Sequence, residues 1–176
     1  MTEERIALVD PTAELAESFL SMLDEYAQLG EDQFGSLAEQ CRRDFAASVR
    51  KLHDAARGAG LPPGWVPYDT YWLVRAGRTV LGTSRLRHRL SEELLHGGGH
   101  IGYDIRPSER RKGYGTRILA LTLERTRARG VRRALVTCLA DNVASARVIE
   151  NNGGVLEDEI LSESMGGPLK RYWIDL

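Results

Sequence analysis

The sequence lacks an excess of charge of either sign, and lysine is rare in it. The 24 lysines and arginines nearly balance the 25 aspartates and glutamates, which leaves a net charge of −1. Such a balance gives no overall field that would attract nucleic acid or an anionic membrane. A local cluster of cations must therefore act locally, and we expect neither nucleic acid nor a membrane as a partner.

Cysteines and long apolar runs are also scarce. Cys41 and Cys138 form no CxxC pair, which argues against a disulfide framework or a metal site and favours a reducing cytoplasm. No apolar run approaches the ~20 residues of a membrane span. The first twelve residues are partly acidic and have no apolar core, so they do not resemble a signal peptide. We therefore expect a cytoplasmic protein without a bound metal.

What the sequence does contain is typical of a globular domain. Its 176 residues are 42% hydrophobic and 28% charged, which is ordinary for a chain that buries a core. No internal repeat or low-complexity segment divides it. We expect a single α/β domain over residues 1–176.

Apolar periodicity predicts a mixed order of helices and strands. The predicted strands are 6–9, 70–75, 79–87, 100–105, 134–139, 155–160 and 171–176. The predicted helices are 12–30, 36–57, 116–129 and 143–151. Residues 91–99 are expected to form a loop that ends in three glycines, and 152–154 a left-handed cap.

The stretch SERRKGYGT, residues 108–116, sets three cations beside two glycines, between a predicted strand and a predicted helix. Gly113 and Gly115 allow a positive φ and a close approach of backbone to a ligand. The helix that follows adds N–H groups and a positive dipole end, which together suit a pyrophosphate. The Walker A and dinucleotide patterns both fail, because Lys112 precedes Gly113 and Ile118 stands where a third glycine is needed.

The pattern that does fit is R-x-x-G-x-G, at Arg110, Gly113 and Gly115, with a proline upstream. Here the chain resembles the pyrophosphate loop of the GNAT superfamily of acetyl-CoA-dependent N-acetyltransferases. A second segment, which begins at Asn142 and Ser145, resembles the family's second cofactor motif. Asn142 is also a good N-cap for the helix of that motif.

The resemblance implies a GNAT fold: a central, mostly antiparallel sheet with a V-shaped splay between the fourth and fifth strands, flanked by helices. It implies acetyl-CoA as co-substrate. The residues that it places at the cofactor are Ile105, Arg110, Arg111, Lys112, Gly113, Tyr114, Gly115, Thr116, Asn142 and Ser145. It also implies that chain between the first two strands forms a wall of the acceptor site, although the charges of residues 36–57 equally fit a solvated helix face.

The catalytic residues depart from the family's pattern. Where the second motif usually has a tyrosine acid, this sequence has Ile149. Tyr103 and Asp104 are our candidates for the replacement acid or base, and strand alternation puts them on opposite faces. Further candidates are His100, Glu93, Cys138 and Tyr172. Every candidate has a structural alternative: Tyr103, Cys138 and Tyr172 as packing residues, Asp104 as a surface strand residue, His100 (like His96) as a solvent-exposed residue, and Glu93 as a loop residue.

Two functions therefore stand side by side. The first is an N-acetyltransferase that moves acetyl from the thioester directly to a primary amine. The second, suggested by the missing tyrosine, is an inactive module that only binds acyl-CoA and senses or regulates. The acceptor is open among small amines, peptides and polycations, and a homodimer is a state that the resemblance allows.

Overall fold

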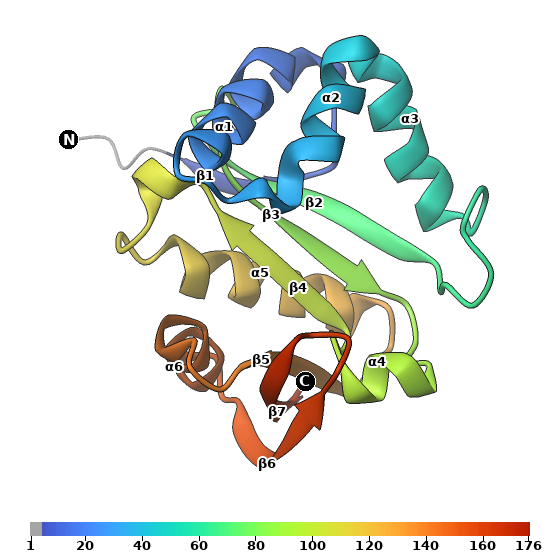
Figure 1. Ribbon diagram of the computed structural model, residues 1–176, viewed down its shortest axis with the longest axis vertical. Helices are drawn as coiled ribbons and strands as arrows, with labels where there is room; N and C mark the ends of the chain where they lie inside the picture. Colours follow the sequence, from blue (N-terminus) through green and yellow to red (C-terminus); the bar gives the residue numbers. More distant parts are fainter. Residues whose placement is uncertain (1–4) are drawn as a thin grey trace.

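The structure is a computed structural model that describes residues 5–176, and it forms one seven-stranded sheet with helices on both faces (Figure 1). The strands are β1 (Ile6–Val9), β2 (Tyr68–Arg75), β3 (Thr79–Arg87), β4 (Ile101–Ile105), β5 (Arg133–Leu139), β6 (Val155–Ser162) and β7 (Gly167–Asp175). The helices are α1 (Ala16–Gln28), α2 (Gly35–Arg43), α3 (Phe45–Ala56), α4 (Glu92–His96), α5 (Tyr114–Ala128) and α6 (Val143–Asn151).

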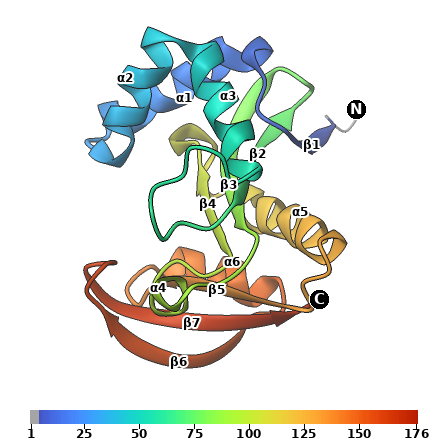
Figure 2. The same cartoon turned by 90° about the vertical axis from the view of Figure 1, so that its right-hand side faces the viewer.

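The sheet has the order β1-β2-β3-β4-β5-β7-β6 and is antiparallel except between β4 and β5. These two parallel strands share one register pair, Ile101 with Val136, and then part. Figure 2 shows the consequence: β5, β7 and β6 run in a different direction from β1 to β4. The expected V-shaped splay between the fourth and fifth strands is confirmed.

His100 bonds β4 to β5 at the end where the two strands are still paired. Its backbone N–H donates to the Leu135 carbonyl at 2.7 Å, and its ring Nδ1 accepts from the Leu135 N–H at 2.9 Å. The side chain is only 7% exposed, so the expectation of a solvent-exposed His100 is wrong. An imidazole that accepts a backbone bond satisfies a donor that the parting strands would leave unpaired.

The core is divided between the two faces of the sheet. Adjacent residues of β2 show the alternation, because Trp72 packs under α1 to α3 while Leu73 packs under α5 and α6. Ile149, which stands at the position of the family's tyrosine, is fully buried in the second of these clusters. Both cores follow the period of two expected for strands covered on both faces.

The predicted helix 36–57 is wrong as one helix, since the chain breaks it at Asp44. Asp44 adopts an extended backbone (φ −156°, ψ 95°), and its carboxylate accepts from the Ala47 N–H at 2.8 Å. An aspartate that caps a new helix competes well with continuation of the old one. The predicted loop 91–99 likewise contains a short helix, α4, which Ser91 caps through the Leu94 N–H.

Candidate active site

The glycine loop lies between β4 and α5, at the open end of the splay. Gly113 has φ +84° and directly precedes α5, and a Cβ there would have no heavy atom within 4 Å. Its expected positive φ is confirmed. Gly115 instead lies inside α5, where a Cβ would come within 3.1 Å of Val148 on α6. Gly115 therefore serves the close packing of two helices.

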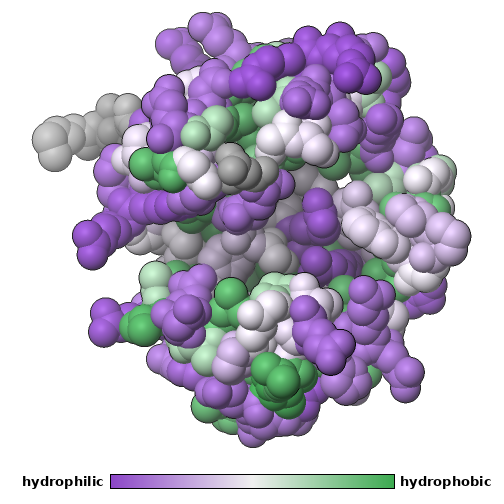
Figure 3. Space-filling model, in the orientation of Figure 1, coloured by the Kyte–Doolittle hydropathy of each residue, from purple (hydrophilic) through white to green (hydrophobic). Residues whose placement is uncertain are grey.

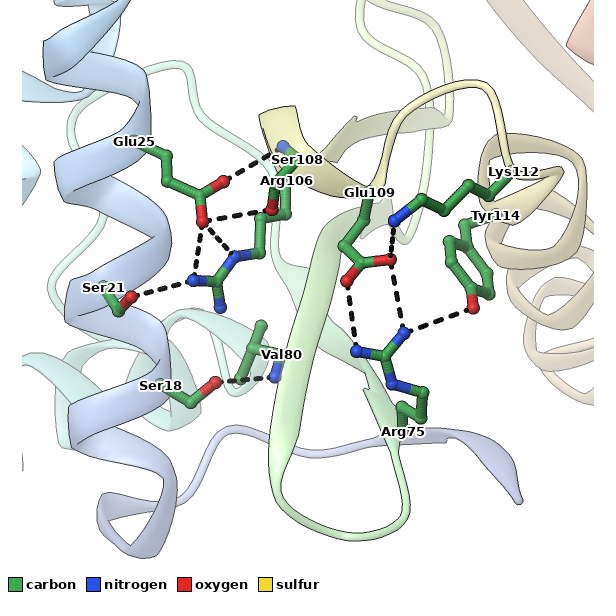
Figure 4. Close-up of polar contacts among 10 residues, drawn as sticks. All are labelled: Ser18, Ser21, Glu25, Arg75, Val80, Arg106, Ser108, Glu109, Lys112 and Tyr114. Carbon is green, nitrogen blue, oxygen red and sulfur yellow. Dashed lines mark hydrogen bonds and ion pairs between the residues drawn. The ribbon is translucent and has the colours of Figure 1, made fainter. Parts of the chain in front are cut away.

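Helix α1 holds the start of this loop. The Glu25 carboxylate accepts from Arg106 Nε at 2.7 Å, from the Ser108 N–H at 3.0 Å and from Ser108 Oγ at 3.1 Å (Figure 4). Burial alone would raise the pKa of Glu25, but these hydrogen bonds hold it below its ordinary value. Glu25 therefore stays ionised and fixes the turn between β4 and the glycines.

Arg110, the arginine of the pattern, faces α1. Its two terminal nitrogens contact Glu31 at 2.7 and 2.8 Å, its Nε donates to the Ile105 carbonyl, and its guanidinium lies over the Tyr26 ring. The hydrogen bonds from Arg110 lower the pKa of Glu31. In this arrangement the side chain of Arg110 ties the loop to Ile105 and to Glu31, and the Glu31 carboxylate neutralises its charge.

Cations gather on the other side of Gly113. Glu109 is buried and accepts from Arg75 Nη2 at 3.1 Å and from Lys112 Nζ at 3.0 Å (Figure 4). An open depression beside Gly113 is lined by the charged residues Arg5, Arg75, Lys112 and Arg117. Three of these four cations lie outside the motif, in β2, in α5 and just before β1, so the motif alone could not find them.

Tyr103 lies across the splay from α6. Its hydroxyl is 2.7 Å from Ser145 Oγ, and the Ser145 N–H donates to the capping side chain of Asn142 at 3.0 Å. Burial raises the pKa of Tyr103 to about 12. The predicted cap is confirmed, and Tyr103 carries its proton throughout the neutral range.

Asp104 points to the opposite face, as alternation predicts. It lines a cavity of about 300 Å³ between β2–β4 and the helices α1 to α3. Burial raises the pKa of Asp104, against the opposing effect of Arg85 and Arg110. Figure 3 shows the surface hollowed between the part that carries α1 to α3 and the part that carries β6 and β7. The two candidate residues therefore serve two different spaces.

The other candidates are structural. Cys138 and Tyr172 are 5% and 1% exposed, and the Tyr172 hydroxyl donates to Glu150, so both are packing residues as expected. His96 is exposed as expected, and Glu93 is exposed in the first turn of α4. Among residues 5–176 no group of three His, Cys, Asp or Glu side chains is placed to hold a metal, and no helix is both long and apolar enough to cross a membrane.

The parted parallel strands, the loop at the start of α5 and the facing helix α6 define the GNAT class of acetyltransferase fold. The family described as the acetyltransferase (GNAT) domain matches residues 5–155, and the chain belongs to this family. The expected family and class of enzyme, an N-acetyltransferase, are thereby confirmed. No curated protein matches the chain.

Solved structures share the fold at low sequence identity. The microcin C7 self-immunity acetyltransferase, in complex with acetyl-CoA and AMP, is 13% identical with a TM-score of 0.72, over 99% of this chain and 94% of its own. An acetyltransferase of Salmonella typhimurium that modifies the N-terminal serine of ribosomal protein L7/L12 is 18% identical, with a TM-score of 0.69 and coverage of 97% and 95%. A spermidine N-acetyltransferase chimera from Vibrio cholerae and hSSAT is 15% identical, with a TM-score of 0.64 and coverage of 97% and 94%.

Proposed function

We propose that this chain transfers an acetyl group from acetyl-CoA to a primary amine. The observation that carries the proposal is the geometry of Gly113. Its backbone is left-handed, and the space where a Cβ would lie is open, beside the amino end of α5 where β4 and β5 part. Backbone N–H groups at the start of a helix bind phosphate groups well. The proposal takes residues 1–176 as one catalytic domain in the cytoplasm, with a small-molecule or peptide amine as acceptor and no metal or nucleic acid.

The residues at the loop fit the pyrophosphate of acetyl-CoA. The backbone of 112–116 would hold it, with Arg111, Lys112 and Arg117 as charge support, and Asn142 and Ser145 would lie along the arm that leads to the thioester. Arg110 would act by holding the loop, because Glu31 already accepts both of its terminal nitrogens. Acetyl-CoA, when bound, supplies the activated acetyl group.

Tyr103 and Asp104 divide the proton transfers in this proposal. Tyr103 holds a proton at its hydroxyl, opposite Ser145 at the splay, and it would be the acid that replaces the family's tyrosine at the Ile149 position. An amine with a pKa of about 10.4 is almost wholly protonated at neutral pH and must lose a proton before it attacks. Asp104, whose pKa is raised by burial, is a stronger base than an ordinary aspartate, and we assign it this role.

The related structures support an amine acceptor without choosing one. One of them modifies an N-terminal serine and another is a spermidine N-acetyltransferase. Both kinds of amine belong in the first panel of acceptors to be tested.

The decisive test compares Gly113→Val with Gly130→Val. Both glycines have a positive φ, +84° and +81°, and open space at Cβ, so both variants carry similar backbone strain of about 1–3 kcal/mol. Gly130, however, follows the far end of α5. We expect acetyl-CoA to raise the Tm of the wild type and of Gly130→Val. In Gly113→Val the affinity should fall about a hundredfold, or ~3 kcal/mol.

Turnover is measured as thiol release with acetyl-CoA and a panel of primary amines. Acetyl-CoA binding without thiol release from any amine would favour the inactive binding module. If acetyl-CoA fails to stabilise the wild type, or if the two glycine variants bind it equally, the proposed cofactor site is wrong.

A further inference from the structure

The cavity at Asp104 has an aromatic wall. Phe19 stacks on Trp72 with ring centroids 4.5 Å apart, and Phe45 meets Phe19 edge to face at 5.8 Å. Val49 and Leu52 of α3 complete this side of the cavity. Its volume of about 300 Å³ lies at the lower end of the range for small-molecule sites. An apolar group of the size of a leucine or phenylalanine side chain fits such a space.

Arg87 brings a cation to the rim of this cavity without a carboxylate beside it. Its Nη1 donates to the carbonyls of Gly98 at 2.9 Å and Gly99 at 3.1 Å, and it makes no ion pair within residues 5–176. Burial and the like charge of Arg85 lower the pKa of Arg87 to about 10. A largely buried cation is stabilised by a nearby anion. The site is therefore suited to an anionic group on the ligand.

A second cavity continues from the same two arginines. Arg85 and Arg87 line both spaces, and the second, of about 250 Å³, is bounded by Trp65, Tyr68 and Met165. Trp65 and Met165 are 52% and 41% exposed, so apolar surface borders this cavity on its solvent side. We refer to these two cavities, which share the two arginines, as the groove.

We infer that the acceptor is an α-amine that carries a bulky apolar side chain and has a carboxylate close by. The inference rests on the proposed amine acetylation and narrows its substrate. The amine would lie at Asp104, the side chain against Phe19 and Trp72, and the carboxylate at Arg85 and Arg87. Acetylation converts the ammonium group into an amide and releases CoA thiol and one proton.

Two sources offer this chemistry: a free apolar amino acid, or a peptide whose first residue is apolar and whose second is acidic. Polycations are disfavoured, because the described residues that line the first cavity include one carboxylate, Asp104, beside two arginines. The aromatic wall of Phe19, Phe45 and Trp72 disfavours a peptide that begins with a small polar residue.

The test measures binding and turnover for matched acceptors in the presence of acetyl-CoA. The panel contains free phenylalanine and free serine, phenethylamine as the amine without a carboxylate, spermidine, and the tripeptides Phe-Asp-Gly, Phe-Lys-Gly and Ser-Asp-Gly. We expect the phenylalanine ligands with a carboxylate to exceed their serine, lysine and decarboxylated counterparts by about tenfold or more in kcat/KM. Preference for free phenylalanine or for Phe-Asp-Gly distinguishes the two sources.

Three variants locate the groove. Gly102 lines the first cavity opposite Arg85, has no positive φ, and a Cβ there would meet nothing within 4 Å, so Gly102→Val fills the groove while the strand is kept. We expect the acceptor KM to rise about tenfold or more, with the acetyl-CoA thermal shift unchanged. In binding measurements, Arg85→Gln should weaken the ligands with a carboxylate and leave phenethylamine unchanged, whereas turnover of every ligand also responds to the loss of Arg85 beside Asp104. Arg89→Gln, an exposed arginine outside both cavities, is its control.

Preference for spermidine or for the serine ligands, or an Arg85→Gln variant that retains full discrimination for the carboxylate, would overturn the inference while acetyl transfer stands. If binding follows the expected order but no ligand releases thiol, the inference holds and the proposed turnover fails. Arg87→Gln is a second variant for the anionic site, and its Tm without ligand shows how much of its effect comes from the lost contacts to Gly98 and Gly99.

Discussion

Acidification should weaken this fold through His100. Burial, together with the like charge of Arg87, lowers the pKa of the His100 ring from its ordinary 6.5 to about 4. A charged imidazole would also lose its bond from the Leu135 N–H. A group whose pKa is lower in the folded state stabilises the fold above its unfolded pKa and loses that contribution as pH falls. The loss therefore begins near pH 6.5 and is complete only below about pH 4.

The size of the effect follows from the two pKa values. A difference of about 2.5 pH units, at ~1.4 kcal/mol each, gives ~3 kcal/mol in all, of which ~2 kcal/mol is lost between about pH 7.5 and pH 5. The pKa values of Glu25, Glu31 and Glu109 are lowered from the ordinary 4.5, so these carboxyl groups lose their contribution to stability mainly below pH 5. The decline above pH 5 should therefore come chiefly from His100.

The assay is urea unfolding at pH 7.5, 6 and 5 for the wild type, His100→Asn and His96→Asn. Asparagine can still accept the Leu135 N–H but does not titrate, so His100→Asn should lose the ~2 kcal/mol pH dependence whatever its stability at pH 7.5. His96 is exposed, and its variant should keep the wild-type dependence. If His100→Asn and the wild type lose stability equally as the pH falls, His100 does not join β4 to β5 as a neutral hydrogen-bond acceptor, and the reasoning is refuted.

Two further substitutions separate chemistry from packing. Tyr103→Phe removes the proton at the splay and should lower kcat by about 10²–10⁴ with little change in Tm, whereas an unchanged kcat and pH profile would eliminate Tyr103 as the acid. Ile149→Ala empties a fully buried position and should lower the free energy of unfolding by about 2–5 kcal/mol while the pH profile of kcat keeps its shape; a shifted profile would contradict the packing role.

The order of helices and strands was largely predictable because the strands and long helices have strong periodicity, whereas the splayed sheet was predicted from the family resemblance. The predictions were wrong where a single polar side chain determines the local structure. Asp44 interrupts an amphipathic pattern that otherwise runs through residues 36–57, and only its carboxylate bond to Ala47 shows that it caps a new helix. His100 was assigned to solvent from its glycine neighbours, since nothing in the local sequence indicates that a parallel strand 35 residues later would donate a backbone N–H to its ring.

The site was predictable only in part, for a similar reason. Motif spacing predicted the left-handed backbone of Gly113 and the cap that Asn142 provides through the Ser145 N–H, because both depend on local backbone. The partners of the loop's arginines come from far away in the sequence: Glu25 and Glu31 lie about 80 residues before Arg106 and Arg110. Arg87 is buried because three segments of the chain pack around it, and the residues next to it in the sequence do not predict this burial.

Helix α1 connects the two halves of the proposed reaction. It contributes Phe19 to the proposed acceptor cavity, and three of its polar residues, Ser18, Ser21 and Glu25, bond to β3 and to the loop (Figure 4). The position of this one helix therefore determines both the wall that would hold the acceptor and the turn that would hold the cofactor. Because misplacement by about 1 Å can reduce an enzymatic rate a hundredfold, the position of α1 is as much a condition for acetyl transfer as the glycine motif.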